Sequence, residues 1–170
     1  MKKTIQHNID QARRFLDEYE KNGIDQVARA SELIIECYRN GGCVYLCGNG
    51  GSACDAQHVA GELIGRYRIN RKAMAATALT ADMSVLTCIA NDFDFNEVFS
   101  KQVEGLVKSG DILWAFSCSG TSANIIKAAK KAKELGAKII GFTGKPNTPL
   151  EQLSDVCVWV DAPYAGPAQQ

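Results

Sequence analysis

Two polar stretches of the sequence carry residue types that could bind a small ligand and act on it. In the first, residues 47–62, a glycine-rich turn leads into a helical pattern that carries His58 and Glu62. Side chains four positions apart lie on one face of a helix, so these two are neighbours. A glycine turn followed by a histidine and a carboxylate contains the parts of a small-molecule site. The pair could equally be an ordinary exposed ion pair, or Glu62 could pair with Arg66 one turn further on.

The second stretch, residues 117–122, has the sequence Ser-Cys-Ser-Gly-Thr-Ser and offers four hydroxyl groups within six residues. Gly120 gives the backbone freedom, and the helix predicted after it presents free N–H groups and the positive end of its dipole. Such an arrangement can hold a phosphate, although serine-rich helix starts are also common as plain caps. The sequence lacks the G-x-x-x-x-G-K-[ST] pattern of a P-loop, and residues 48–53 do not meet the dinucleotide pattern G-x-G-x-x-G.

Both stretches follow short apolar runs with the length and composition of buried strands, at residues 43–47 and 112–116. After the first run, Ser52 with Asp55 three positions later predicts a capped helix that begins near Ala53. A strand, a polar turn and a helix therefore follow one another in both places.

Three further runs, 75–79, 138–142 and 156–160, predict strands, and Thr80 is expected to cap a helix that runs through Ile89. Strands that alternate with helices across short turns specify an α/β domain. The predicted fold is a three-layer sandwich with a mostly parallel sheet of roughly five strands and a flavodoxin-type topology. The polar turns then gather at the carboxyl edge of the sheet, where ligands bind in such folds.

Two amphipathic helices, at residues 4–21 and 25–37, are predicted ahead of the first strand. A single doubly wound α/β unit does not require two helices before its first strand. An apolar N-terminal helix pair either packs against another subunit or covers the sheet, and the sequence leaves both possibilities open.

Length, charge and cysteine usage narrow the class of protein. A chain of 170 residues is expected to form one domain. Its 19 basic and 19 acidic residues give a net charge of zero, so the chain has no overall electrostatic attraction to nucleic acid or to a membrane surface. No apolar run approaches the ~20 residues of a spanning helix, and the polar N-terminus lacks a signal peptide, so we expect a cytoplasmic protein. Six of the seven cysteines lie in apolar or helical patterns and are expected to be buried free thiols, whereas Cys118 lies in a polar loop.

Six segments, in order and with compatible spacing, resemble the phosphoheptose isomerase family, which belongs to the sugar isomerase (SIS) domain family. They extend over nearly the whole chain and are 47–52 (CGNGGS), 55–67 (DAQHVAGELIGRY), 87–92 (TCIAND), 99–104 (FSKQVE), 108–113 (KSGDIL) and 117–122 (SCSGTS). The resemblance implies a single SIS domain over residues 1–170, with N-terminal helices at 1–41 and an α/β core at 42–170.

The resemblance also implies an activity. Family members convert sedoheptulose 7-phosphate to D-glycero-D-manno-heptose 7-phosphate through an enediol. This is the first step toward nucleotide-activated heptose for lipopolysaccharide or other surface glycans. The family resemblance further implies a homo-oligomer, a tetramer, with sites near subunit boundaries.

Position by position, Glu62 matches the catalytic acid/base of the family. In zinc-containing members, which hold one ion per subunit, His58, Glu62 and Gln169 match metal ligands. Cys118 stands where the family often has threonine. The positions that match substrate-binding residues are Asn49, Gly50, Gly51, Ser52, Glu62, Arg66, Asn91, Asp92, Ser117, Cys118, Ser119, Ser122 and Gln169.

The sequence departs from the family pattern near its end. It stops at Gln170, before the histidine that serves the family as second catalytic group and fourth metal ligand, and Gly166 stands where some members have aspartate. We therefore expect a truncated or partial chain without its closing helix. The alternatives are a non-catalytic SIS-domain sensor of sugar phosphates, an adaptor that binds the bacterial replication initiator, or an isomerase of another phosphosugar. Glu62 argues against the non-catalytic readings, because such adaptors generally lack this carboxylate.

Overall fold

The computed structural model describes residues 1–160 of the chain, and it contains every helix and strand that the sequence predicts. In chain order the elements are α1 (Lys2–Asn22), α2 (Ile24–Arg39), β1 (Val44–Gly48), α3 (Gly51–Ile64), β2 (Ala76–Ala78), α4 (Met83–Asp92), the 3₁₀ helix η1 (Phe95–Glu97), α5 (Ser100–Leu106), β3 (Ile112–Ser117), α6 (Ala123–Glu134), β4 (Lys138–Thr143), α7 (Pro149–Leu153) and β5 (Val156–Trp159).

The five strands form one parallel sheet in the order β2-β1-β3-β4-β5, which confirms the predicted flavodoxin-type topology. The chain leaves β1 toward β2 and then returns to the other side of β1 to form β3. Ligands bind at such a switch point in open α/β sheets. Gly48, at the end of β1, is paired with Phe116, one residue before the end of β3, so the two polar stretches leave the sheet side by side.

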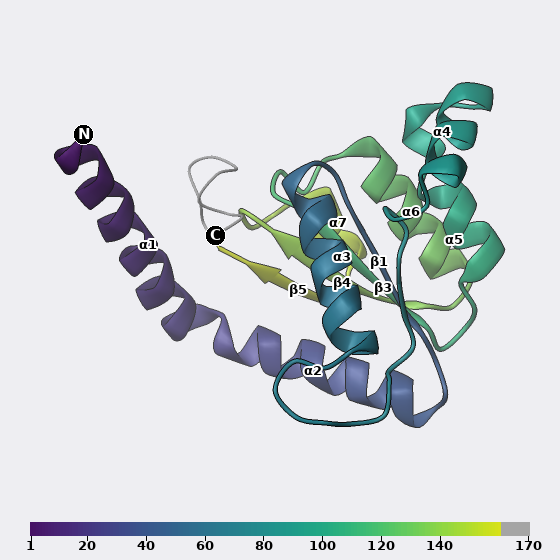
Figure 1. Ribbon diagram of the computed structural model, residues 1–170, viewed down its shortest axis with the longest axis horizontal. Coiled ribbons are helices and arrows are strands. Elements are labelled where there is room, and N and C mark those ends of the chain that lie inside the picture. Colours follow the sequence, from purple (N-terminus) through teal and green to yellow (C-terminus); the bar gives the residue numbers. More distant parts are fainter. Residues whose placement is uncertain (161–170) are drawn as a thin grey trace.

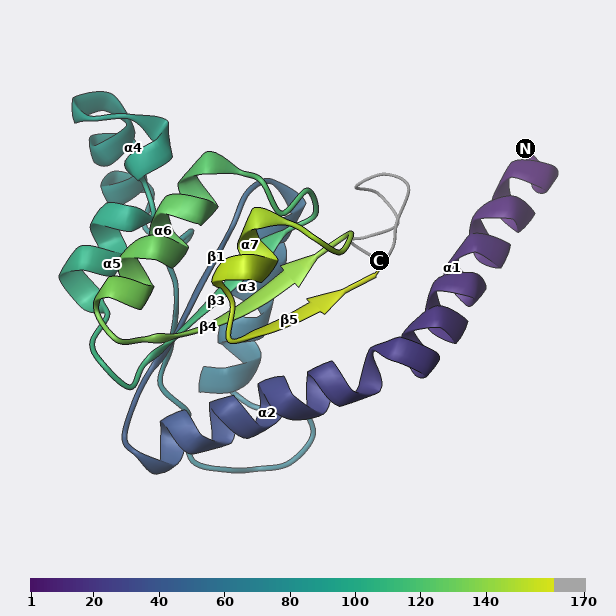
Figure 2. The ribbon, with the colours of Figure 1, turned by 180° about the vertical axis from the view of Figure 1, so that it is seen from behind.

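Helices cover both faces of the sheet and give the three predicted layers (Figures 1 and 2). One core lies between the sheet and α2 with α3, and contains Val44, Leu46 and Ile112. The other lies between the sheet and the helices α4 to α7, and contains Leu113 and Ile139. Successive strand residues thus point to opposite cores, as the period of a strand requires.

The two N-terminal helices differ in how much of their apolar surface the chain itself covers. Helix α2 buries Ala30 and Cys37 against the sheet layer. Helix α1 extends away from the body of the domain (Figures 1 and 2) and leaves the side chains of Ile5 and Leu16 more than half exposed. Of the two possibilities left open by the sequence, covering the sheet therefore describes α2 but not α1.

Two predicted helix caps are wrong. Helix α3 begins two residues earlier than Ser52 and Asp55 predict, because Gly50 adopts φ +58° and serves as the N-cap itself. Helix α4 is capped by Asp82, whose carboxylate accepts from the backbone N–H groups of Ser84 and Val85. Thr80 is buried instead, and its hydroxyl and carbonyl bond to residues of α3.

Helix α7 is absent from the sequence prediction. Thr148 caps it by accepting the backbone N–H of Glu151 at 3.2 Å, and Pro149 occupies its first turn. A capping residue followed directly by proline is a known helix-start pattern, so the signal was present but the helix is only one turn long.

All seven cysteines are free thiols, as the odd count and spacing predict. Burial is less general than expected, because Cys54 and Cys88 lie on solvent-exposed faces of α3 and α4. Cys47, in the centre of the sheet, is fully buried, and desolvation raises the pKa of its thiol to about 12. Helical spacing did not reveal on which side of each helix the exposed thiols lie.

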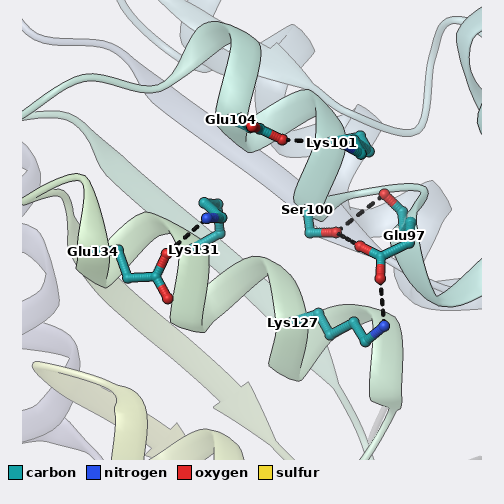
Figure 3. A network of polar contacts seen from close by, with 7 residues as sticks. All are labelled: Glu97, Ser100, Lys101, Glu104, Lys127, Lys131 and Glu134. Atoms are coloured by element: carbon teal, nitrogen blue, oxygen red, sulfur yellow. Dashed lines mark hydrogen bonds and ion pairs between the residues drawn. The ribbon is translucent and has the colours of Figure 1, made fainter.

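A surface network joins η1, α5 and α6 (Figure 3). The ammonium of Lys127 on α6 pairs with the carboxylate of Glu97 on η1, which also accepts from the hydroxyl of Ser100. These contacts tie the helix that follows the second polar stretch to the neighbouring elements. Within residues 1–160, no helix combines the length and apolar character needed to cross a membrane.

Candidate active site

The second polar stretch, residues 117–122, is called the hydroxyl loop below, and it forms a compact turn at the carboxyl end of β3. The hydroxyl of Ser117 donates to that of Ser122 at 3.2 Å. The hydroxyl of Ser119 accepts from both the backbone N–H and the hydroxyl of Thr121, at 3.2 and 3.0 Å. Helix α6 begins directly after the loop, so the positive end of its dipole faces the loop. Ser122 makes no side-chain capping bond to this helix. The arrangement suits an anion.

The hydroxyl loop is held from behind by the segment that leads into α7. The backbone N–H of Gly144 donates to the carbonyl of Cys118 at 2.9 Å, and that of Leu150 donates to the carbonyl of Gly120 at 3.1 Å. Gly120 adopts φ +64°, and a Cβ there would lie 2.4–2.6 Å from atoms of the buried Thr148 side chain. Only glycine fits this conformation and this contact.

The glycine turn, residues 48–50, lies beside the hydroxyl loop at the end of β1. A Cβ on Gly48 would meet the backbone of Ser52 at 2.4 Å, so the turn can close only with glycine there. The amides of Asn49 and Asn124 exchange two hydrogen bonds of 2.9 Å each, which join the turn to the start of α6. The hydroxyl of Ser52 lies 3.9 Å from the thiol of Cys118. The structure therefore brings the two predicted loops together.

A cavity of about 370 Å³ opens at this junction, within the size range of small-ligand sites. Its polar lining comes from the hydroxyl loop, the first turns of α3 and the end of β4, and its apolar floor from the ends of the strands. The lining residues are Tyr19, Ser52, Asp55, Phe116, Ser117, Cys118, Phe142, Thr143, Gly144, Val158 and Val160. A smaller neighbouring hollow is lined by Asn49, Ser52, Phe116, Ser117, Cys118, Ser119 and Ser122. Sequence reasoning missed Tyr19 and Phe142, whose helix and strand patterns mark them only as core.

His58 and Glu62 lie further along α3. Their Nε2 and Oε1 atoms are 3.9 Å apart, and their side chains are 75% and 34% exposed. Glu62 follows Ser52 by ten residues, which corresponds to roughly 15 Å along the axis of a helix. Neither residue lines the cavity. The structure thus confirms that the two side chains are neighbours, and places them away from the hydroxyl loop.

Arg71 fixes the end of α3 and was not singled out from the sequence. Its guanidinium donates to the backbone carbonyls of Glu62 and Leu63, at 2.7 and 2.8 Å. A cation at these carbonyls satisfies the end of the helix and is favoured by its dipole. The turn that carries Glu62 is therefore held from outside the helix, by a residue that the sequence shows only as one of several basic residues in a link.

Three further predicted residues, Arg66, Asn91 and Asp92, do not line the cavity. Arg66 is exposed and donates to the side chain of Asn70 at 2.5 Å. Asn91 and Asp92 are exposed at the end of α4, where the Asn91 amide donates to the Asp92 carboxylate at 2.8 Å. Gln169 lies outside the described residues. Within one chain, the structure therefore joins the two loops but not these polar side chains.

The parallel sheet and its loops define an α/β domain with a polar corner at its switch point. The SIS domain family model matches residues 7–144. A phosphoheptose isomerase of Campylobacter jejuni is 51% identical over 130 residues, which cover 76% of this chain and 70% of that protein. The solved phosphoheptose isomerase of Neisseria gonorrhoeae is 38% identical with a TM-score of 0.92, covering 99% of this chain and 90% of that one. That of Francisella tularensis is 30% identical with a TM-score of 0.94, covering 98% and 89%. The chain belongs to the phosphoheptose isomerase family of SIS-domain proteins.

Proposed function

We propose that the chain is an aldose–ketose isomerase that converts sedoheptulose 7-phosphate to D-glycero-D-manno-heptose 7-phosphate through an enediol. The observation that carries this proposal is the meeting of the hydroxyl loop with the glycine turn and the start of α3 around two neighbouring hollows, from which α3 leads to Glu62. Family membership supports the same activity, because this chain resembles phosphoheptose isomerases over most of its length.

The hydroxyl loop is the proposed phosphate grip. Ser117, Ser119 and Ser122 offer hydroxyl groups that can rotate to donate to phosphate oxygens, and the start of α6 adds backbone N–H groups. The reaction leaves the phosphate itself unchanged. Its role is to fix the position of the sugar, so that the reacting carbons stay aligned with the catalytic groups.

Glu62 is separated from the hydroxyl loop along α3, so a base at this position would act far from the phosphate. In a seven-carbon ketose 7-phosphate, the phosphate and the reacting carbons C1 and C2 stand at opposite ends of the molecule. Glu62 lies roughly 15 Å along α3 from Ser52, and helical side chains lean back toward the N-terminus. A carboxylate at this place is remote from the proposed phosphate site.

Glu62 is the proposed base. Its carboxylate takes a proton from C1 of the ketose, and the electron pair of that C–H bond forms the C1–C2 double bond. At the same time the π pair of the C2 carbonyl moves onto its oxygen, which takes up a proton from water, and the product is the enediol. Return of a proton to C2, with loss of the proton from the C1 hydroxyl, gives the aldose. General acid–base catalysis of this kind contributes about 10²–10⁴-fold to a rate.

The test is incubation of a purified full-length form of the protein with sedoheptulose 7-phosphate and detection of the aldose 7-phosphate. Pentose and hexose ketose phosphates in parallel reactions distinguish an isomerase of another phosphosugar. A chain that binds sedoheptulose 7-phosphate and turns over none of these substrates would contradict the proposal and favour a sensor or adaptor.

The proposal extends to one zinc ion per subunit, with His58, Glu62 and Gln169 as ligands. An imidazole nitrogen and a carboxylate oxygen are typical zinc ligands, and on adjacent turns of α3 they lie close enough to share an ion. Within residues 1–160 no cluster of three His, Cys, Asp or Glu side chains could hold a metal, so these residues supply two ligands. Zinc would polarise the substrate carbonyl. Protein purified without chelator that lacks stoichiometric metal would contradict this.

The proposed assembly is a homo-oligomer, a tetramer, in the cytoplasm. Its support is the exposed apolar side of α1, where Ile5, Ile9 and Leu16 are 54%, 43% and 68% exposed. Burial of this face against further subunits would remove apolar surface from water. Sedimentation of a monomer at micromolar concentration would contradict the assembly.

A further inference from the structure

We propose that Asn124 is a positioning residue of the isomerase, and that it acts by holding the glycine turn against the hydroxyl loop through a reciprocal amide pair with Asn49. The inference rests on the proposed function and adds a residue to it. Asn49 is expected to contact the sugar, whereas no role was expected for Asn124.

The two amides form a closed pair. Nδ2 of Asn49 donates to Oδ1 of Asn124, and Nδ2 of Asn124 donates to Oδ1 of Asn49, both at 2.9 Å. The backbone N–H of Ile125 donates to the same Oδ1 of Asn124 at 2.9 Å. This third bond requires an oxygen at that position, so it fixes the orientation of the Asn124 amide and, through the pair, that of Asn49.

Because the Asn124 amide is buried, loss of its hydrogen-bond partner carries a free-energy cost. Asn124 is 3% exposed, and a buried amide that loses its partner leaves a polar group unsatisfied. The pair uses one hydrogen and one lone pair of Asn49, which leaves it one further donor hydrogen and one further acceptor site. Asn49 can therefore still contact the sugar, but only in the direction that Asn124 allows.

The pair joins two loops that are supported unequally. The hydroxyl loop has a second anchor in the segment behind it, through the bonds of Gly144 and Leu150. The glycine turn is joined to α6 by the Asn49–Asn124 pair. Loss of the pair should therefore displace the glycine turn and leave the phosphate grip in place.

A double-mutant cycle with Asn49→Ala, Asn124→Ala and the double variant tests this, with kcat/KM for sedoheptulose 7-phosphate and the Kd of inorganic phosphate as readouts. Each single variant should lower kcat/KM about 10- to 100-fold, since each removes both bonds of the pair. The double variant should be no worse than the poorer single variant. The Kd of inorganic phosphate should change less than about threefold, because the anchored hydroxyl loop keeps its geometry.

Gln102→Ala is the matched control. Gln102 is also a buried amide, 8% exposed, and donates to the carbonyls of Leu79 and Val98. It should lower the melting temperature without lowering kcat/KM. If Asn124→Ala does not fold, Asn124→Asp replaces it, because the carboxylate keeps the oxygen that accepts from Ile125. The carboxylate also still accepts from Nδ2 of Asn49 but can no longer donate to its Oδ1, so the cycle with Asn124→Asp measures the loss of one bond of the pair.

Additive losses in the double variant would overturn the proposal, and so would a loss of phosphate affinity equal to the loss in kcat/KM. The first would mean that Asn49 and Asn124 act independently, and the second that the pair only stabilises the phosphate grip. An inactive full-length wild type would instead contradict the proposed function, so the two failures are distinguishable.

Discussion

The hydroxyl loop and the outer face of α3 divide the proposed reaction between them, and they are built in opposite ways. The hydroxyl loop is compact, with its serines bonded to one another and its backbone held by the segment before α7. The face of α3 presents His58 and Glu62 to solvent, outside the cavity of the same chain. One region is complete within residues 1–160, and the other is open on its outer side.

This difference follows from what each region has to do. A phosphate grip must be the same before and after the reaction, so a rigid, fully bonded turn serves it well. A base must reach a carbon at the far end of the substrate and exchange protons, so it needs access. Binding and proton transfer should therefore respond separately to substitution.

The largest expected effect is that of Glu62→Gln. This change keeps the shape of the side chain and removes its basicity, so kcat should fall about 10²–10⁴-fold while inorganic phosphate still binds. Exchange of the substrate C–H proton with deuterated water measures the step directly. Exchange at the wild-type rate would show that Glu62 is not the base.

Substitutions in the hydroxyl loop should show the opposite pattern. Ser119→Ala and Ser122→Ala each remove a hydroxyl donor to a charged group, so KM should rise about 10- to 100-fold in each variant. Proton exchange at saturating substrate should change much less. An unchanged KM in both variants would contradict the assignment of this loop to the phosphate.

Gly120→Ala tests the support behind the loop. The new methyl group would meet Thr148 at 2.4–2.6 Å, in a backbone conformation with φ +64°. We expect a loss of roughly 2–5 kcal/mol in the free energy of unfolding, from strain and overpacking together. Gly110→Ala is the control, because Gly110 has φ +89° but no atom within 4 Å of the added methyl. It should lose about 1–2 kcal/mol in urea unfolding.

The smallest effect concerns Glu97, which holds α6, the helix that follows the loop. The bond from Lys127 and then that from Ser100 lower the pKa of Glu97 from its ordinary value of 4.5. A carboxyl whose pKa is lower in the folded state than in the unfolded state stabilises the folded protein at pH values above the unfolded-state pKa. This contribution is lost as the pH falls through the folded-state pKa. Glu97→Gln should slightly lower the melting temperature at pH 7, and the difference should vanish in acid.

Glu134→Gln, on α6, removes the same charge together with the separate ion pair to Lys131, and serves as the control for net charge in these pH series. A difference between wild type and Glu97→Gln that stays constant from neutral to acidic pH would contradict the role of the Glu97 carboxylate. The expected size is small because the pair is exposed to solvent.

Much of the fold could be predicted because apolar runs and polar turns alternate clearly along the chain. The hydroxyl loop and the glycine turn could be assigned to one edge for the same reason, since parallel strands end at the same side. The caps were less predictable. Ser52 and Thr80 have good capping side chains, but Gly50 turns the chain earlier and Asp82 bonds the first turn of α4.

The support of the site could not be predicted, because it consists of contacts between distant segments. Arg71 appears in the sequence as one basic residue among several, and only the folded link brings it to the end of α3. Asn124 appears as an ordinary residue at a helix start, and Thr148 as a residue of a turn. The periodicity of apolar residues indicates which face of a helix or strand is buried, but it does not indicate which polar groups of different elements form contacts.

The pairing of Asn49 with Asn124 joins residues 75 positions apart in the chain. The junction of the glycine turn and the hydroxyl loop therefore depends on one of the longer loop closures of the fold. Contacts of such sequence separation cost chain entropy before they gain stability, and parallel sheets that depend on them fold slowly. During synthesis, β1 and α3 with Glu62 are complete long before α6 is available to close the corner. Sugar-phosphate binding should therefore be among the last properties that a newly made chain acquires, and bound ligand should stabilise the chain against unfolding from then on.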